Sequence, residues 1–253
     1  MKFQVSEPFL SHKTAIKSVV ENFKQTGEDF IVGKRNAIKL FEFQGKTLNI
    51  KSFRIPNLVN KIAYKYFRKS KASRSFEYAN RLISNGIGTP LPIAFFENYD
   101  IIGLKDSYYI SEHLQADLTF RELVLIPDFP DHENILRQFT RFSFDLHEKG
   151  IEFLDHSPGN TLIKKIESNQ YEFYLVDLNR MKFHNNMDFE ARMKNLRRLT
   201  PKEDMIAVIS NEYAKFYNKS ETEIFQKLWQ ETSEFQKGFA RKKRMKKKLK
   251  FWK

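Results

Sequence analysis

The chain has 253 residues, of which 41% are hydrophobic and 15% aromatic, and this apolar content excludes global disorder. The absence of cysteine excludes disulfides and cysteine-ligated zinc and fits a reducing compartment. The net charge of +13 is uneven: residues 241–253 (RKKRMKKKLKFWK) carry nine basic side chains and no acid, which leaves +4 for residues 1–240.

The first half of the chain is predicted to form an antiparallel sheet. After an amphipathic lead-in of 28 residues, the segments DFIV, IKLFEF and TLNIKSF predict a three-stranded meander with a tight turn at residues 44–46. Successive side chains of a strand leave opposite faces of the sheet. Leu48 and Ile50 are therefore expected on one face and Lys51 on the other.

A helix is predicted next, from Ser73 as its N-cap to Asn85, with Gly86 after its end. The segments PLPIAFFE, IIGLKD and SYYISEHL then predict two more strands. These elements together predict an N-terminal lobe, residues 1–113, with a five-stranded antiparallel sheet and one helix.

The second half of the chain is mostly helical in pattern. The segment HENILRQFTRFSFDLHEKG has an apolar stripe at helical spacing and ends at Gly150. Two short strands, TLIKKI and YEFYLVDL, follow as a hairpin, and residues 188–239 return to helical spacing. We therefore predict an α+β protein whose helical C-terminal lobe spans residues 114–240.

Three polar residues around this hairpin carry the strongest chemical signal. Asp155 is followed five residues later by Asn160, and Asp177 stands directly after the hairpin. A carboxylate that orients an attacking hydroxyl, with two oxygen ligands for magnesium, is the set that phosphoryl transfer from ATP requires. Each residue alone is more often a cap or turn former, so the prediction depends on their joint spacing.

Two histidines lie close to this motif. His147, one turn before the glycine that ends the helix, is read as a structural hydrogen-bonding residue rather than a catalytic base. His156 has no partner that the sequence identifies, and Arg180, just after the hairpin, could equally meet an anionic substrate or clamp the loop.

At this point the chain resembles the lipopolysaccharide kinase family, whose members phosphorylate inner-core sugars such as 3-deoxy-manno-octulosonic acid (Kdo) or heptose. The resemblance covers about residues 28–210. It is carried by Asn49-Ile-Lys-Ser-Phe, the run from Phe67 to Glu77, Thr89-Pro-x-Pro, His147-x-x-Gly-Ile, Asp155-x4-Asn160, Val176-Asp-Leu-Asn-Arg, and Arg192-x-x-Asn-Leu-x-Arg-Leu. The resemblance implies a protein-kinase-like bilobal fold and the use of ATP with Mg²⁺.

The resemblance also implies roles for residues of the N-terminal lobe. By position, Lys51 corresponds to the lysine that holds the nucleotide phosphates, and Glu77 to its ion-pair partner on the helix. The residues expected to cover the phosphates are Gly33, Lys34 and Arg35, and the segment from Glu112 to Leu114 is expected to present backbone groups to adenine.

The chain departs from the protein-kinase pattern in several places. The phosphate-covering loop has a single glycine, Asn49 replaces a small apolar residue, and the residues beside Asp155 and Asp177 differ from the usual ones. These departures argue against a regulated protein kinase and leave the expected metal ligands in place.

The basic segment 241–253 allows three interpretations: a solvated end, a nucleic-acid patch, or an anchor on an anionic membrane. We favour the membrane, because the acceptor expected for this family is a lipid-linked sugar. No apolar run approaches the roughly 20 residues needed to span a bilayer, and MKFQVSEPFL does not resemble a signal peptide. The expected location is the cytoplasmic face of the inner membrane.

The leading hypothesis is transfer of the ATP γ-phosphoryl group to a sugar hydroxyl of the lipopolysaccharide inner core. A second hypothesis keeps the kinase chemistry with a protein or another small alcohol as acceptor. A third is a non-catalytic kinase-like scaffold, or a nucleic-acid binder that works through the basic segment. The sequence does not identify the acceptor hydroxyl or the oligomeric state.

Overall fold

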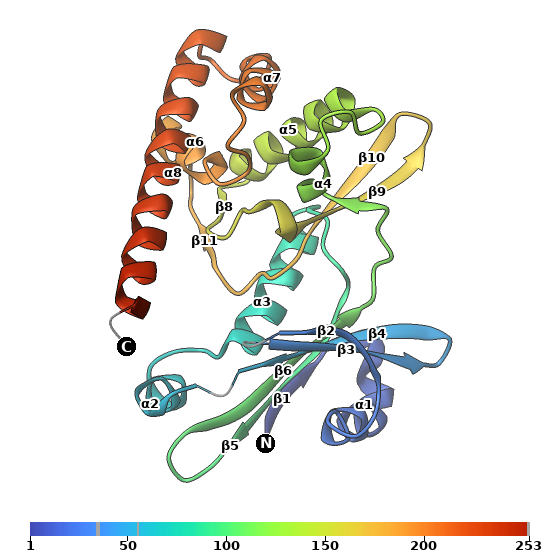
Figure 1. Cartoon of the computed structure of the whole chain (residues 1–253). Helices are drawn as coiled ribbons and strands as arrows, with labels where there is room; N and C mark the ends of the chain where they lie inside the picture. Colours follow the sequence, from blue (N-terminus) through green and yellow to red (C-terminus); the bar gives the residue numbers. More distant parts are fainter. Residues whose placement is uncertain (34–35, 55, 252–253) are drawn as a thin grey trace. The chain divides into compact units, whose positions relative to one another are not determined.

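The computed structural model describes residues 1–33, 36–54 and 56–251, and in the last helix it describes side chains as far as Met245. The chain forms two compact units (Figure 1). The first comprises residues 1–115 with residues 177–179, and the second comprises residues 116–176 and 180–253.

The first unit is built on a six-stranded antiparallel sheet with the order β1-β5-β6-β4-β3-β2. The predicted strands are present, and the lead-in adds a further strand at the edge, where Lys2–Val5 pair with residues 94–97. The strands are β1 (Lys2–Val5), β2 (Glu28–Val32), β3 (Asn36–Phe43), β4 (Lys46–Phe53), β5 (Pro92–Tyr99) and β6 (Leu104–Glu112).

The two faces of this sheet carry different helices. Leu48 and Ile50 are fully buried in a cluster that also holds Ile16 and Val20 of α1 (Lys13–Glu21), which follows the short helix η1 (Glu7–His12). The other face packs Phe53 of β4 against α3 (Lys71–Ser84). The predicted alternation along β4 is therefore confirmed.

Helix α3 begins earlier than the sequence predicted. Its N-cap is Ser70, whose hydroxyl accepts a hydrogen bond from the backbone N–H of Ser73 at 3.1 Å. Ser73 is itself inside the first turn. Two serines three residues apart both fit a capping position by residue type, and the packing of the following turn selects the earlier one. The chain also contains α2 (Leu58–Tyr66), which the sequence analysis did not predict.

The second unit contains most of the helices. The predicted hairpin is confirmed as β9 (Thr161–Glu167) and β10 (Gln170–Leu175), and β7 (Leu118–Thr119) adds a third strand to it. A separate pair joins β8 (Ile151–Phe153) to β11 (Met181–Phe183). The helices are α4 (Phe120–Leu125), α5 (His132–Glu148), α6 (Phe189–Leu196), α7 (Glu203–Ala214) and α8 (Glu221–Phe251), with the short helix η2 at Pro158–Asn160.

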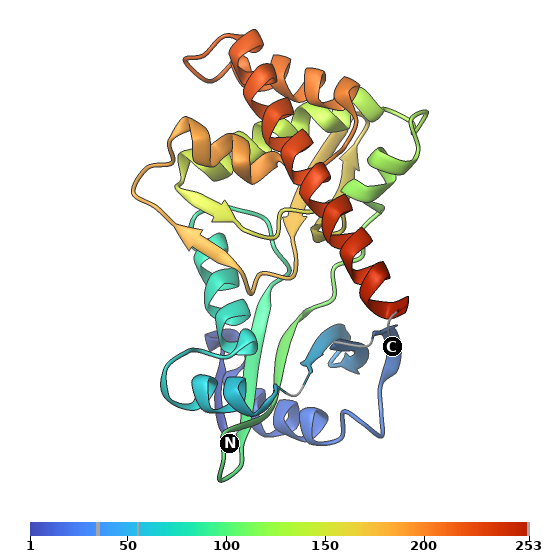
Figure 2. The same ribbon diagram turned by 60° about the vertical axis from the view of Figure 1, so that its left-hand side comes forward.

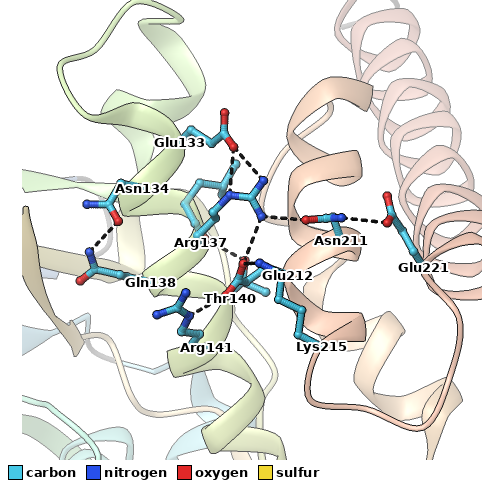
Figure 3. A network of polar contacts seen from close by, with 11 residues as sticks. Glu133, Asn134, Arg137, Gln138, Thr140, Arg141, Asn211, Glu212, Lys215 and Glu221 are labelled. Atoms are coloured by element: carbon cyan, nitrogen blue, oxygen red, sulfur yellow. Dashed lines mark hydrogen bonds and ion pairs between the residues drawn. The ribbon is translucent and has the colours of Figure 1, made fainter.

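A buried carboxylate joins α5 to α7 (Figure 3). Glu212 of α7 is fully buried and accepts charge-assisted hydrogen bonds from Arg137 at 3.0 Å, Arg141 at 2.6 Å and Lys215 at 2.6 Å. Burial alone would raise the pKa of Glu212, but the three cations outweigh it and hold the pKa below its usual value. This network holds α5 against α7, and α5 is the helix that leads into the predicted catalytic loop.

The basic C-terminal segment is not separate from the helix before it. Helix α8 continues from Glu221 through Phe251, so residues 241–251 extend it (Figure 2). Trp252 and Lys253 lie outside the described residues. Among the residues that are described, no helix is both long enough and apolar enough to span a membrane.

Candidate active site

The loop that carries Asp155 starts from a sharp chain reversal at the end of α5. Gly150 follows the helix at a φ of +67°, and a Cβ there would lie 2.0 Å from the carbonyl oxygen of His184. Only glycine fits both the conformation and the space. The carbonyl of Gly150 accepts a hydrogen bond from the N–H of His184 at 2.8 Å, so this reversal also aligns β8 with β11.

Asp155 is held by backbone and side-chain contacts within the loop. Its carbonyl oxygen accepts hydrogen bonds from the N–H of Ser157 at 2.7 Å and from Nδ2 of Asn160 at 2.8 Å. The second bond brings the two predicted residues together. It also assigns the amide nitrogen of Asn160, because the donor of this bond is Nδ2.

A residue to which the sequence analysis gave no role contacts the carboxylate of Asp155. Nη2 of Arg198 lies 2.9 Å from Oδ1 of Asp155, and Nη1 donates to the carbonyl oxygen of Leu154 at 3.1 Å. The guanidinium lies 5.5 Å from the ring centroid of Phe235 in α8. One arginine therefore fixes both the side chain of Asp155 and the backbone just before it. The only sequence signal was the Arg192-x-x-Asn-Leu-x-Arg run, which did not indicate this contact.

Behind the loop lies a buried hydrogen-bond network around His147. Its Nδ1 lies 3.0 Å from the hydroxyl of Tyr213, and its Nε2 lies 3.1 Å from Oδ1 of Asn195. Nδ2 of Asn195 donates to the carbonyl of Phe153 at 2.8 Å. Burial lowers the pKa of His147 to about 3, so the ring is neutral near pH 7. These contacts fit the structural role that the sequence analysis gave this residue.

His156 and Arg180 occupy different surroundings. His156 is fully buried, with its ring centroid 5.6 Å from those of both Phe139 and Phe153, and burial lowers its pKa to about 4. Arg180 is exposed, and its carbonyl oxygen accepts a hydrogen bond from the N–H of Leu154 at 3.1 Å. The backbone of Arg180 thus positions the residue that precedes Asp155.

The hairpin delivers Asp177 in an unusual conformation. Val176, the residue before it, donates its N–H to the carbonyl of Asn160 at 3.0 Å, so the chain enters Asp177 directly from the loop. Asp177 itself has a φ of +59°, a left-handed conformation that costs free energy for a non-glycine residue. Residues in strained backbone conformations cluster at functional sites, so the conformation of Asp177 is consistent with a functional role.

The side chain of Asp177 meets the predicted phosphate-binding lysine. Nζ of Lys51 donates to Oδ1 of Asp177 at 2.7 Å, and Nδ2 of Asn179 donates to the same oxygen at 2.7 Å. Lys51 is 13% exposed and Asp177 is 31% exposed. Both donors bind Oδ1 and neither of them engages Oδ2, the second carboxylate oxygen.

Glu77 has a different partner from the one expected. Its Oε2 lies 2.6 Å from Nζ of Lys69, and both side chains are about half exposed. The structure therefore pairs Glu77 with Lys69 in place of Lys51. The sequence placed Glu77 on a helix beside the sheet but could not tell which way this turn of the helix faces, because that depends on where α3 begins.

The remaining predicted nucleotide-binding residues lie on strands and loops of the first unit. Gly33 donates its N–H to the carbonyl of Asn36 at 3.1 Å, and Lys34 and Arg35 lie outside the described residues. Glu112 ends β6 and pairs with Lys46 at 2.9 Å, while its N–H donates to the carbonyl of Leu91. Leu114 is half-buried in the irregular stretch after this strand.

The donor chemistry suits magnesium. Carboxylate and amide oxygens are hard ligands, and Mg²⁺ is usually held by one or two carboxylates together with substrate phosphates rather than by a complete protein cage. In the described part of the chain, no group of three or more His, Asp or Glu side chains forms such a cage. Asp177 offers a carboxylate and Asn160 an amide oxygen, which are ligand types that Mg²⁺ accepts, and their role as its ligands stays a prediction.

Comparisons with known proteins identify a family and a fold for this chain. The model of the lipopolysaccharide kinase (Kdo/WaaP) family matches residues 31–219. The structure of WaaP in complex with acyl carrier protein is similar with a TM-score of 0.66 and 14% identity, over 95% of this chain and 99% of that chain. A MAP kinase from Leishmania major is similar with a TM-score of 0.47 and 15% identity, over 85% of this chain and 66% of that one. A search of curated proteins found no match.

The likeness to WaaP confirms the α+β, protein-kinase-like fold that the sequence predicted. The family match covers well over half of the residues and includes the loop of Asp155 and the hairpin that leads to Asp177. Members of this family are kinases that phosphorylate sugar hydroxyl groups. The chain therefore belongs to the lipopolysaccharide kinase (Kdo/WaaP) family and is a phosphotransferase.

Proposed function

We propose that the protein transfers the γ-phosphoryl group of ATP to a hydroxyl of an inner-core sugar, Kdo or heptose, on a lipid A precursor. The observation that carries this proposal is the loop in which Asn160 holds the backbone of Asp155 and Arg198 holds its carboxylate. A carboxylate with its position set by three separate contacts suits the task of orienting an acceptor hydroxyl for attack.

Each residue has one part in this mechanism. Asp155 accepts a hydrogen bond from the acceptor hydroxyl and directs its oxygen toward the γ-phosphorus. Lys51 binds the nucleotide phosphates, and its contact with Asp177 places the ammonium group beside that carboxylate. Asn160 and Asp177 hold Mg²⁺, which neutralises charge on the phosphates when it is bound.

The location follows from the acceptor. A lipid A precursor sits in a membrane, so the enzyme has to work at a bilayer surface. The nine basic residues of segment 241–253 would attract the protein to anionic lipids. We propose peripheral attachment at the cytoplasmic face of the inner membrane through this segment.

The test is transfer from ATP, with magnesium, to a Kdo-bearing lipid A precursor, read by mass for one added phosphate. The precursor without Kdo, a heptose-bearing precursor, a protein, an aminoglycoside and choline serve as competing acceptors. Phosphorylation of the Kdo- or heptose-bearing precursor alone supports the proposal. Transfer only to the other acceptors would reassign the substrate, and no transfer to any of them would point to a scaffold.

A pair of variants tests the mechanism apart from the substrate. Asp155→Asn is expected to abolish transfer while ATP binding stays within about twofold, because the residue acts on the acceptor rather than on the nucleotide. Asp145→Asn is the matched control: its side chain is half exposed and pairs with Lys149 on the surface of α5. Full activity of Asp155→Asn would contradict the proposed mechanism.

A further inference from the structure

Helix α2 exposes a row of large apolar side chains. Leu58, Ile62 and Tyr66 stand four residues apart, so they share one face of the helix, and Val59 and Phe67 extend this face at its two ends. Val59 is 75% exposed and Phe67 is 85% exposed. No residue of α2 is buried.

The tip of the β5–β6 hairpin lies beside α2 (Figures 1 and 2), and it carries two more apolar residues. Ile101 is 97% exposed and Ile102 is 50% exposed. We define the α2 patch as Leu58, Val59, Ile62, Tyr66, Phe67, Ile101 and Ile102.

Specific contacts hold the helix on the hairpin. Nζ of Lys61 pairs with Asp100 at 2.8 Å, and Nζ of Lys65 donates to the carbonyl of Ile101 at 2.8 Å. At Gly103 a Cβ would lie 2.4 Å from the carbonyl oxygen of Lys61, so only glycine allows this close approach. The α2 patch is therefore presented on a fixed support.

Such a surface is unfavourable unless something covers it. A nine-residue helix is marginal in water on its own, and most helices are stabilised by burying an apolar face. Here the apolar face points to solvent. Contiguous exposed apolar side chains with polar neighbours mark sites of protein or membrane interaction.

The charge around the α2 patch selects the kind of partner. Residues 54–71 contain six Lys or Arg and no Asp or Glu. A short helix with an apolar face, basic neighbours and an aromatic residue is the pattern of helices that lie in the interface of an anionic bilayer. Tyr66 has the apolar ring and polar tip that suit the headgroup region.

The shape of the α2 patch also favours a bilayer. Val59, Phe67 and Ile101 are 75% to 97% exposed, so their side chains project from the surface. A protein partner needs a complementary pocket for each projecting side chain, whereas a bilayer accepts them at any position among its acyl chains and headgroups.

We infer that the α2 patch is a membrane-docking surface that inserts into anionic phospholipid. It is separate in sequence from the basic segment 241–253 and does not depend on the chemistry of Asp155. Two such contacts would give firmer attachment than either one alone, because a single signal gives only marginal, reversible binding and stable anchoring generally needs two.

The test is co-sedimentation of the full-length protein with vesicles of equal parts phosphatidylethanolamine and phosphatidylglycerol. The double variant Val59→Ser with Phe67→Ser removes the most exposed apolar side chain of α2 and that of the residue directly after it. Its binding to these vesicles is expected to fall about tenfold, with the thermal unfolding midpoint unchanged. The matched control is Leu125→Ser with Ile126→Ser, which alters two exposed apolar residues of the second unit and is expected to bind like the wild type.

The alternatives give distinct results. If the Val59→Ser, Phe67→Ser double variant (the α2 variant) binds vesicles as well as the wild type, the inference is overturned. Membrane attachment would then depend on segment 241–253, which is intact in every variant. Unchanged vesicle binding with lost binding to acyl carrier protein would make the α2 patch a protein-docking surface. Unchanged vesicle binding with a dimer converted to a monomer in gel filtration would make it a contact between two copies.

A phosphorylation assay separates this inference from the proposed function. With a water-soluble Kdo acceptor, the α2 variant is expected to keep wild-type activity, since none of its substituted residues belongs to the proposed site. Loss of vesicle binding with retained activity supports the inference even if the natural acceptor differs from Kdo. Equal loss of soluble activity and vesicle binding would show a folding defect and overturn it.

Discussion

Arg198 holds Asp155 by two points: Nη2 lies 2.9 Å from the carboxylate, and Nη1 binds the carbonyl oxygen of the preceding residue at 3.1 Å. Arg198→Ala is expected to lower kcat by about tenfold to a hundredfold, because a displaced carboxylate no longer aligns the acceptor hydroxyl. The KM for ATP is expected to change little. Steady-state kinetics with ATP and acceptor varied separately checks this.

The control for this prediction is the neighbouring arginine. Arg197 also lies over the ring of Phe235, but its guanidinium pairs with Glu231 at 3.2 Å, whereas Asp155 pairs with Arg198. Arg197→Ala is expected to keep kcat within about threefold, and Arg198→Lys is expected to recover part of the lost rate. Equal losses for Arg197→Ala and Arg198→Ala would mean that both act only by stabilising the fold.

Lys51 is expected to contribute to nucleotide affinity. Lys51→Met should weaken binding of magnesium-ATP by about tenfold to a hundredfold, because a charge-assisted hydrogen bond to phosphate is lost. Calorimetric titration measures this directly. Lys46→Met on the same strand removes a solvent-exposed ion pair with Glu112 and should change the affinity less than about twofold. Unchanged affinity in Lys51→Met would contradict the assignment.

Glu77 gives a contrasting prediction. Because its carboxylate pairs with Lys69 at the surface, Glu77→Gln is expected to change kcat and ATP affinity by less than about threefold. The sequence-based assignment instead predicts a large loss of activity for this variant. Comparing the activities of Glu77→Gln and Lys69→Met distinguishes the two assignments of Glu77. A severe loss of activity in Glu77→Gln alone would show that Glu77 turns to Lys51 during catalysis.

Two buried histidines predict how stability depends on pH. Burial lowers the folded-state pKa of His147 to about 3 and that of His156 to about 4, against an unfolded value of 6.5. Between these values the unfolded state binds more protons, so the free energy of unfolding falls as the pH drops below 6.5. Each histidine contributes a slope of roughly 1.4 kcal/mol per pH unit.

Urea unfolding at several pH values between 4 and 7 measures this slope. His156→Phe places a ring of similar size between Phe139 and Phe153. This variant is expected to lower the slope of the unfolding free energy against pH by the contribution of about one histidine. His113→Asn, which alters a partly exposed histidine, is the comparison. The same slope in His156→Phe and the wild type would show that His156 does not titrate with folding.

The loop motif and the local elements could be predicted because short-range rules decide them. Alternation placed Leu48 and Ile50 on one face of β4 and Lys51 on the other, and the glycine after the apolar stripe marked the end of α5. The spacing of Asp155, Asn160 and Asp177 around one hairpin led to the prediction of phosphoryl transfer, which stays a prediction at the level of these residues.

The contacts that only the tertiary structure decided depend on how segments pack. Arg198 reaches Asp155 and the lead-in strand pairs with β5 across long stretches of sequence, whereas Glu77 turns to Lys69, only eight residues away. The exposed face of α2 belongs to the same class, because a short apolar run in the sequence looks the same whether it is buried or left in solvent. Local propensity determines where helices and strands form, but the partner of a charged or apolar side chain depends on packing, which no single segment of the chain encodes.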